Sequence, residues 1–384
     1  AASGLLSPTQ QAKAQAALPA HAASAPQTAA FLVATGYLTR FQADRLLAGR
    51  TDGFVIDPYV IQDQIGRTAG GRVFKAVHRS LNRTVAIKVL AADLTRTPEA
   101  RAAFRRESQA AAKLNHPNVV TTLDANERGD RAYVVAEYVD GPDLEHLVRD
   151  RGPLPVGEAC ELVRQIAVGL QHAHEQGMAH RDLRPTNLLV ARASKTLPGC
   201  VVKIAEFGIA RLAPPPGETW GCPDFAAPEQ AGGGSGDHRT DLYSLGCVFY
   251  FLLTGRPPFP GGTPESKARR HQTEAPVPVD RVRPDVPWGV AEIVHQLLAK
   301  NPNKRVQSAA ALAARLDVVA AGSVAVEEDG TYITFDMPDG GRAAQSYHSG
   351  FLTGMHPQPT PARGRPDPVG DTAPSPWSQL TAEL

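Results

Sequence analysis

Two short runs in the middle of the chain contain residues whose types and spacing fit a chemical role. The first, HRDLRPTN, covers residues 180 to 187, and the second, EFG, covers residues 206 to 208. In the first run, Asp182 can accept the proton of an attacking hydroxyl, and Asn187 can hold a metal ion through its amide oxygen. Glu206 adds a second hard oxygen ligand. A base near oxygens that can hold a metal is compatible with phosphoryl transfer, and the spacing of these runs makes a chance match improbable.

A glycine-rich run nearer the N-terminus fits the binding of nucleotide phosphates. It reads IGRTAGGRV from Ile65 to Val73 and lies between two predicted strands. Gly66 and Gly71 would let backbone N–H groups approach phosphate oxygens with no Cβ in the way. Taken alone, this run fits an ordinary glycine-rich hairpin better than a nucleotide site.

A lysine and a glutamate farther along the chain could bind nucleotide phosphates together with the glycine-rich run. Lys88, in the run VAIK, lies on a predicted strand and is expected to point into a cleft, although a lone lysine there would normally be a solvated charge. Glu107 lies on the predicted helix that follows. Its carboxylate would orient the ammonium group of Lys88 over the α and β phosphates.

Two groups of elements must position these residues. Between residues 55 and 139, apolar and polar residues alternate with period two and are separated by Gly or Asn turns, which predicts an antiparallel sheet of five strands. One helix, at residues 97–114, interrupts the strands. Residues 140–318 are mostly helical in pattern. The sequence therefore predicts an α+β fold with a small antiparallel β lobe, a larger α-helical lobe and a cleft between them.

Three further segments flank the predicted lobes. Residues 1–54 are rich in Ala, Leu and Gln and predict a small helical extension, either a packing element or a docking element for a partner. Residues 319–356 predict a β-hairpin that turns at Asp329-Gly330. Residues 357–384 are rich in proline and predict a disordered tail.

Composition narrows the partners and the compartment. The 40 basic and 39 acidic residues nearly cancel, so no global charge favours a nucleic acid or an anionic membrane as partner. The four cysteines are far apart in the sequence, which favours a reducing, cytoplasmic environment over zinc or disulfides. The longest apolar run, at residues 247–253, is too short for a membrane span and predicts a buried core helix instead.

From Tyr59 to about Leu316, the chain resembles the eukaryotic-like bacterial serine/threonine protein kinases. The resemblance rests on HRDLRPTN together with EFG, AAPE, TDLYSLG, GRPPFPGG and KNPNKR. It implies the bilobal protein-kinase-like fold, a salt bridge between Glu229 and Arg305, and a role for Asp241 in anchoring the catalytic loop.

The resemblance also implies that the chain binds ATP and magnesium (Mg2+) and acts on a protein substrate. Asp182, Lys88, Glu107 and Arg184 would be catalytic, and Asn187 and Glu206 would hold the metal. The nucleotide would be bound by Ile65, Gly66, Gly71, Lys88, the backbone of Glu137 and Val139 at the adenine, Asp143 at the ribose, and Val73, Ala86 and Leu189 on the faces of the base.

Four residues depart from the family pattern. Thr68 replaces a glycine of the loop, Arg184 replaces a lysine, Cys222 replaces a threonine that bonds the catalytic Asp, and Glu206 replaces the magnesium-binding Asp of the usual DFG. Glu206 is still a carboxylate but is one methylene longer, and Mg2+ demands nearly octahedral geometry. A misplacement of about 1 Å can cost roughly 100-fold in rate.

Two hypotheses follow from these departures. The first is an ATP-dependent serine/threonine kinase of reduced rate, which the conservative chemistry of Arg184, Cys222 and Glu206 favours. The second is a pseudokinase that binds nucleotide or acts as a scaffold, which the number of departures favours. A small-molecule kinase is a third reading, but GCPDFAAPEQ is the wrong substrate platform for one.

Overall fold

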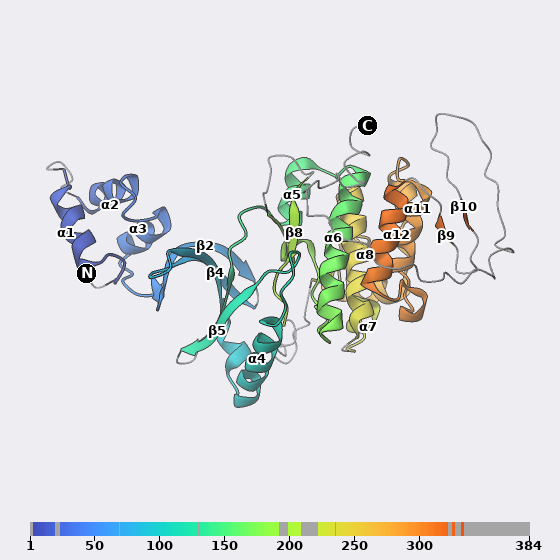
Figure 1. The fold of residues 1–384 in the computed structure, drawn as a ribbon, viewed down its shortest axis with the longest axis horizontal. Helices are drawn as coiled ribbons and strands as arrows, with labels where there is room; N and C mark the ends of the chain where they lie inside the picture. Colours follow the sequence, from blue (N-terminus) through green and yellow to red (C-terminus); the bar gives the residue numbers. More distant parts are fainter. Residues whose placement is uncertain are drawn as a thin grey trace, which may run out of the picture. The chain divides into compact units, whose positions relative to one another are not determined.

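The computed structural model describes residues 3–19, 24–68, 70–128, 131–191, 199–208, 222–234, 236–321, 325–326 and 332–333. The chain divides into two compact units, whose elements are drawn in Figure 1. Unit 1 consists of Ala1–Gly141 and Ala205–Trp220, and unit 2 consists of Pro142–Ile204 and Gly221–Leu384.

The main element of unit 1 is a six-stranded antiparallel sheet with the strand order β1-β2-β3-β4-β6-β5. Five strands were expected, and the additional one is β1, which has only two residues and therefore shows no period-two pattern. Apolar side chains of β2, β3, β4 and β6 form the hydrophobic core of this sheet. The strands are β1 (Val55–Ile56), β2 (Tyr59–Thr68), β3 (Gly71–His78), β4 (Arg83–Leu90), β5 (Thr122–Arg128) and β6 (Arg131–Glu137).

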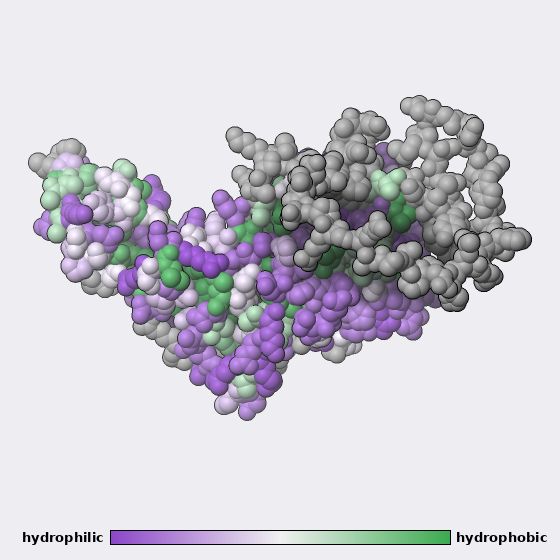
Figure 2. Space-filling model, in the orientation of Figure 1, coloured by the Kyte–Doolittle hydropathy of each residue, from purple (hydrophilic) through white to green (hydrophobic). Residues whose placement is uncertain are grey.

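One amphipathic helix, α4 (Pro98–Ala111), packs on this sheet after the short 3-10 turn η1 (Ala92–Thr95). Thr97 caps it by accepting the N–H of Ala100, and Pro98 occupies its first turn. Phe104 and Ala111 are buried. The outward surface over α4 is mostly hydrophilic (Figure 2). The helix therefore meets the sheet through a narrow apolar stripe.

Three short helices precede the sheet in unit 1. Each of them begins with a capping box, in which a Ser or Thr hydroxyl and a Gln side chain satisfy the first backbone N–H groups. They are α1 (Pro8–Ala16), α2 (Ala25–Ala34) and α3 (Arg40–Leu47).

Unit 2 is built mainly from helices. In Figure 1, α6 (Val156–Glu175) lies beside both α8 (His238–Thr254) and α12 (Ala309–Ala320). The apolar run expected to form a core helix is part of α8, which is almost entirely buried. The other elements are α5 (Leu144–Arg151), η2 (Pro185–Asn187), β7 (Leu188–Ala191), β8 (Val201–Ile204), α7 (Pro228–Ala231), α9 (Pro264–Thr273), α10 (Val279–Val282), α11 (Trp288–Leu297), η4 (Pro302–Lys304), β9 (Ala325–Val326) and β10 (Tyr332–Ile333).

The predicted α+β class is confirmed, with an antiparallel sheet and one packed helix in unit 1 and a helical unit 2. Strands β9 and β10 pair antiparallel, but the predicted turn at Asp329-Gly330 lies outside the described residues, as does the tail at residues 357–384. Among the described helices, none combines the length and the apolar character that crossing a membrane requires.

Candidate active site

The glycine-rich run forms the turn between β2 and β3 in unit 1, where Thr68 pairs with Gly71. Gly71 has φ 142°, and a Cβ there would lie 2.1 Å from the carbonyl oxygen of Val89. Only glycine fits that position. A Cβ on Gly70 would lie 3.7 Å from Nζ of Lys88, so the loop passes directly beside the lysine ammonium group.

Lys88 is held in the middle of the sheet with its charge nearly buried. On β4 it pairs with Val73 of β3 and Val134 of β6, and only 7% of the residue is exposed. A buried ammonium group needs a counterion. The structure supplies one in Glu206, whose Oε1 lies 2.7 Å from Nζ of Lys88.

This pairing differs from the expected one, because the sequence suggested Glu107 as the partner of Lys88. Glu107 lies on α4 beside the EFG run, because a Cβ on Gly208 would lie 3.0 Å from the backbone oxygen of Glu107. Phe207 is 8% exposed and lines, with Phe104 and Glu107, a void of only about 10 Å³. The EFG run therefore packs closely against α4.

Glu206 adopts an unusual backbone conformation, with φ 70°. The left-handed region is uncommon for residues other than glycine, and Asn and Asp enter it several times more readily than most others. The backbone of this position therefore suits Asp better than Glu, whereas the side chain of Glu206 makes the contact with Lys88.

The residues expected around the adenine ring lie in both units. In unit 1, Ala86 pairs with Ala136 across β4 and β6, and the side chain of Glu137 accepts the N–H of Thr121 at 2.9 Å. Val139 lies two residues after Glu137, beyond the end of β6, and Ile65 is 46% exposed on β2. Contacts of these residues with a nucleotide stay predictions.

In unit 2, the two residues assigned to the ribose and the base are brought together. Asp143 and Leu189 form an isolated antiparallel bridge. The carboxylate of Asp143 also caps α5, because it accepts the backbone N–H of His146 at 2.8 Å.

The HRDLRPTN run forms a compact polar cluster in unit 2. The amide nitrogen of Asn187 donates to the backbone oxygen of Asp182 at 2.8 Å and to its carboxylate at 3.3 Å. Nε of Arg184 lies 3.4 Å from the same carboxylate. The structure thus brings together the three predicted residues Asp182, Arg184 and Asn187. Asn187 uses its amide nitrogen for Asp182, so the amide oxygen is the atom it can offer to a cation.

This cluster is anchored by Asp241, which is completely buried on α8. Its carboxylate accepts the backbone N–H groups of His180 and Arg181 at 2.8 and 2.7 Å, and Nε2 of His174 lies 2.8 Å away. Burial acts to raise the pKa of Asp241, but the hydrogen bond and charge of His174, with the other donors, outweigh it and lower the pKa. Asp241 therefore stays ionised and fixes the loop.

Cys222 lies near this cluster but bonds elsewhere. Its Sγ is 3.7 Å from Oδ2 of Asp224, and Asp224 in turn pairs with Lys267 at 2.7 Å. Burial raises the pKa of the Cys222 thiol, which keeps it neutral and only a weak donor.

The implied salt bridge between Glu229 and Arg305 is present. Both carboxylate oxygens of Glu229 accept from the guanidinium group at 2.7 Å, and the Arg305 side chain is fully buried. Burial acts to raise the pKa of Glu229. The hydrogen bond from Arg305 and the other donors outweigh this effect, so the pKa is lowered overall. The pair fixes the end of the AAPE segment to the helical unit.

Sequence reasoning missed two contacts of the site. The pairing of Lys88 with Glu206 requires a choice between two carboxylates, and spacing along the chain cannot make that choice. The contact of His174 with Asp241 joins residues 67 positions apart. No motif in the sequence marks His174 as different from the neighbouring His172.

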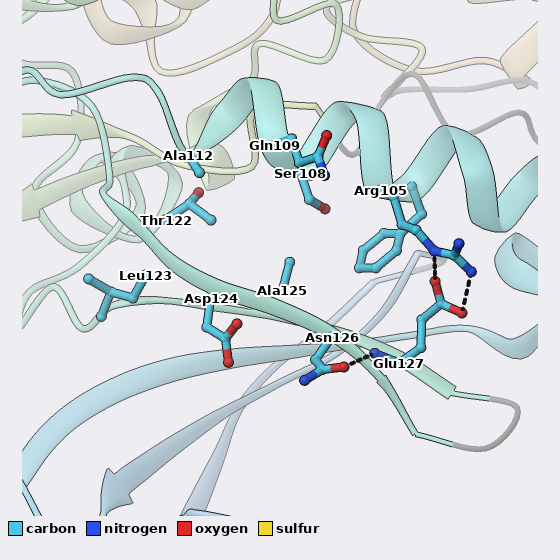
Figure 3. A pocket seen from close by; sticks show the side chains of 11 residues that line it. Arg105, Ser108, Gln109, Ala112, Thr122, Leu123, Asp124, Ala125, Asn126 and Glu127 are labelled. Carbon is cyan, nitrogen blue, oxygen red and sulfur yellow. Dashed lines mark hydrogen bonds and ion pairs between the residues drawn. The ribbon is translucent and has the colours of Figure 1, made fainter.

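A groove lies away from these groups, between α4 and β5 (Figure 3). It has a volume of about 480 Å³. Arg105 and Glu127 form an ion pair at one end, with Nε and Oε1 2.7 Å apart. No predicted site residue lines this groove, so it is not the candidate active site.

Comparison with known proteins agrees with these features. The model of the protein kinase domain family matches residues 59–316. Serine/threonine-protein kinase PknB of Mycobacterium leprae is 40% identical over 276 residues, and serine/threonine-protein kinase pkn2 of Myxococcus xanthus is 36% identical over 318 residues. These alignments cover 69% and 79% of this chain and 43% and 38% of the relatives, so the chain spans less than half of their length. The crystal structure of the PknI kinase domain of Mycobacterium tuberculosis (C20A mutant) is 28% identical, with a TM-score of 0.57, covering 69% of this chain and 97% of that one.

Proposed function

Because the chain belongs to the protein kinase domain family, we propose that it is a serine/threonine protein kinase that transfers the γ-phosphoryl group of ATP to a protein hydroxyl. The observation that carries this proposal is the cluster of Asp182, Arg184 and Asn187, held on a loop that the buried Asp241 anchors. The relatives named above are serine/threonine kinases, which favours this function over the pseudokinase hypothesis.

The proposed reaction assigns one task to each residue of the cluster. The hydroxyl oxygen of the substrate attacks the γ-phosphorus, the bond from that phosphorus to the β–γ bridging oxygen breaks, and ADP leaves. Asp182 takes the proton of the hydroxyl. Arg184 places a positive charge beside the transferring group, and its planar fork can bond two oxygens. Asn187 keeps the carboxylate of Asp182 in place through its amide nitrogen.

We propose that a divalent cation would be held jointly by protein oxygens and by the phosphates of the nucleotide. Among the described residues, no group of three or more His, Cys, Asp or Glu side chains is arranged to hold a metal. Mg2+ is commonly bound by one or two protein oxygens together with substrate phosphates. We propose Asn187 and Glu206 as those protein ligands, and the bound cation would neutralise charge on the phosphates.

The nucleotide assignments follow the same reasoning. Gly66, Gly71 and Lys88 would bind phosphates, because the loop passes beside the lysine. The dispersed cysteines support a reducing compartment such as the cytoplasm.

A single-turnover assay tests the proposal. Purified protein would be mixed with labelled ATP and a basic protein acceptor, and phosphate on serine or threonine would be measured. We expect slow transfer that disappears in Asp182→Asn, a variant with the same shape and no base. Equal labelling by the two proteins, or none by either while ATP binds, would contradict the proposed activity.

A further inference from the structure

The start of helix α3 is bonded directly to strand β2, which leads into the glycine-rich loop. Gln42 is only 3% exposed, and its amide nitrogen donates to the backbone oxygen of Ile61 at 2.6 Å. The hydroxyl of Thr39 donates to the next backbone oxygen, that of Gln62, at 2.5 Å. A buried glutamine is uncommon unless it is hydrogen-bonded. The contact is therefore a specific attachment and not a loose packing of two surfaces.

This attachment lies at an irregularity in the pairing of β2 with β3. The pairing of β2 with β3 shifts between Ile61 and Asp63, which leaves Gln62 as an extra residue, and shifts again between Gln64 and Gly66. Such bulges bend a strand and redirect the residues beyond them. The first bulge is therefore one of the features that set the course of the chain into the phosphate-binding loop.

The edge of the sheet explains why a clamp is needed here. Strand β1 pairs only with Tyr59 and Val60, and the backbone oxygen of Phe54 accepts the N–H of Ile61. Beyond that point, β2 is an edge strand. The side chains of Thr39 and Gln42 bind the next two carbonyl groups, so α3 continues the support that β1 begins.

The same two side chains also form the capping box of α3. The N–H of Thr39 donates to Oε1 of Gln42, and the N–H of Gln42 donates to the Thr39 hydroxyl, at 2.9 and 3.2 Å. Helix start and strand clamp are thus one hydrogen-bonded unit. The ring of Phe41, whose centroid is 6.4 Å from that of Phe74 on β3, packs beside it.

Helix α2 provides an internal comparison. Ser24 and Gln27 form an equivalent capping box, but both residues are exposed. The capping box of α3 therefore differs from that of α2, because it is largely buried and its side chains also bond to a strand.

We propose that Thr39 and Gln42 are positioning residues for the glycine-rich loop, and that helix α3 acts as an internal brace for nucleotide binding. By holding the bulge at Gln62, they fix the direction in which β2 presents Gly66 to the phosphates. The inference rests on the proposed function for its nucleotide, but the rigidity of the loop can be measured without one.

The test compares Gln42→Ala and Thr39→Val with the matched variants Gln27→Ala and Ser24→Ala, which damage a capping box that does not touch the sheet. Amide hydrogen exchange would be followed at residues 62–68 and 70–73, and ATP affinity by calorimetry. We expect exchange in the loop to rise about tenfold and ATP affinity to fall about tenfold in the first two variants, from the loss of one buried hydrogen bond. The KM for ATP should rise while kcat at saturating ATP is unchanged.

Two outcomes would overturn the brace. The first is loop exchange in Gln42→Ala and Thr39→Val equal to that in the α2 variants. The second is exchange that rises uniformly across unit 1, which would indicate general destabilisation. If the unmodified protein binds no ATP, the proposed function fails, whereas the exchange comparison still decides whether α3 holds the loop.

Discussion

Replacing Glu206 with Asp tests whether the additional methylene of this residue limits phosphoryl transfer. Glu206 has φ 70°, in a region that costs an ordinary L-residue roughly 1–2 kcal/mol and that Asp enters more readily. Its carboxylate reaches Lys88 at 2.7 Å. Shortening the side chain by one carbon–carbon bond, about 1.5 Å, withdraws the carboxylate from Lys88 unless the backbone moves.

We expect Glu206→Asp to raise the rate of phosphoryl transfer at least tenfold. A positional error of about 1 Å can cost roughly 100-fold, so a partial correction should recover at least one order of magnitude, which is about 1.4 kcal/mol in the barrier. The same change frees the ammonium group of Lys88 to bind phosphate and to approach Glu107.

The assay is single-turnover transfer from labelled ATP, with Asp182→Asn as the blank and calorimetry to measure ATP affinity. Glu206→Gln is the matched control, because it keeps the length of the side chain and removes the charge, and it should be slower than the unmodified protein. A Glu206→Asp variant that binds ATP normally and transfers phosphate no faster would refute the reasoning. The limit on rate would then lie with another departure, such as Thr68.

Four further changes give independent tests. Burial lowers the pKa of His271 to about 4, whereas a histidine in the unfolded chain titrates near 6.5. Because the unfolded chain then binds a proton that the folded protein does not, the free energy of unfolding should fall as the pH drops from about 6.5 to about 4. Over that window, urea unfolding should show the unmodified protein losing up to about 3 kcal/mol more than His271→Gln, and parallel pH profiles would contradict this. Cys222→Thr should raise kcat/KM about fivefold through one stronger hydrogen bond near Asp182, whereas a decrease would mean that the thiol contact with Asp224 matters more. Asp241→Asn should lower the free energy of unfolding by about 3 kcal/mol, measured in urea, and a loss below 1 kcal/mol would show that the buried charge is dispensable. Ala136 lies just before Glu137 on β6, and its small side chain is expected to leave room beyond the amine of a bound adenine. Ala136→Met should therefore abolish the binding of ATP analogues with a benzyl group on that amine and leave ATP binding unchanged in calorimetry. Equal rejection of the analogues by both proteins would show that neighbouring side chains already fill this room.

The parts of the site that lie close together in the sequence were predictable from spacing. Asp182, Arg184 and Asn187 share one short loop, so their types alone indicated a cluster, and the structure places them within bonding distance. The distant pair of Glu229 and Arg305 was predictable only through the family resemblance. Spacing says nothing about which residues meet across a fold.

The contacts that were not predictable depend on choices between similar partners. Lys88 has two acids within reach of its segment, and the structure pairs it with Glu206 although the motif suggested Glu107. Strand β1 is too short for a periodic signal. The attachment of α3 to β2 was equally hidden, because the capping sequence at Thr39 looks like those at Ser7 and Ser24.

The buried charges of unit 2 help to choose between the kinase and the pseudokinase hypotheses. A buried ion pair adds little to stability, since well-packed apolar side chains of similar volume often do as well or better. Yet Asp241 is completely buried and accepts two backbone N–H groups of the catalytic loop, and Arg305 is buried against Glu229. These groups determine where Asp182 and the AAPE segment lie. A scaffold needs a stable fold but does not need an accurately placed base. The cost of burying these charges therefore favours the proposed phosphoryl transfer over the pseudokinase hypothesis.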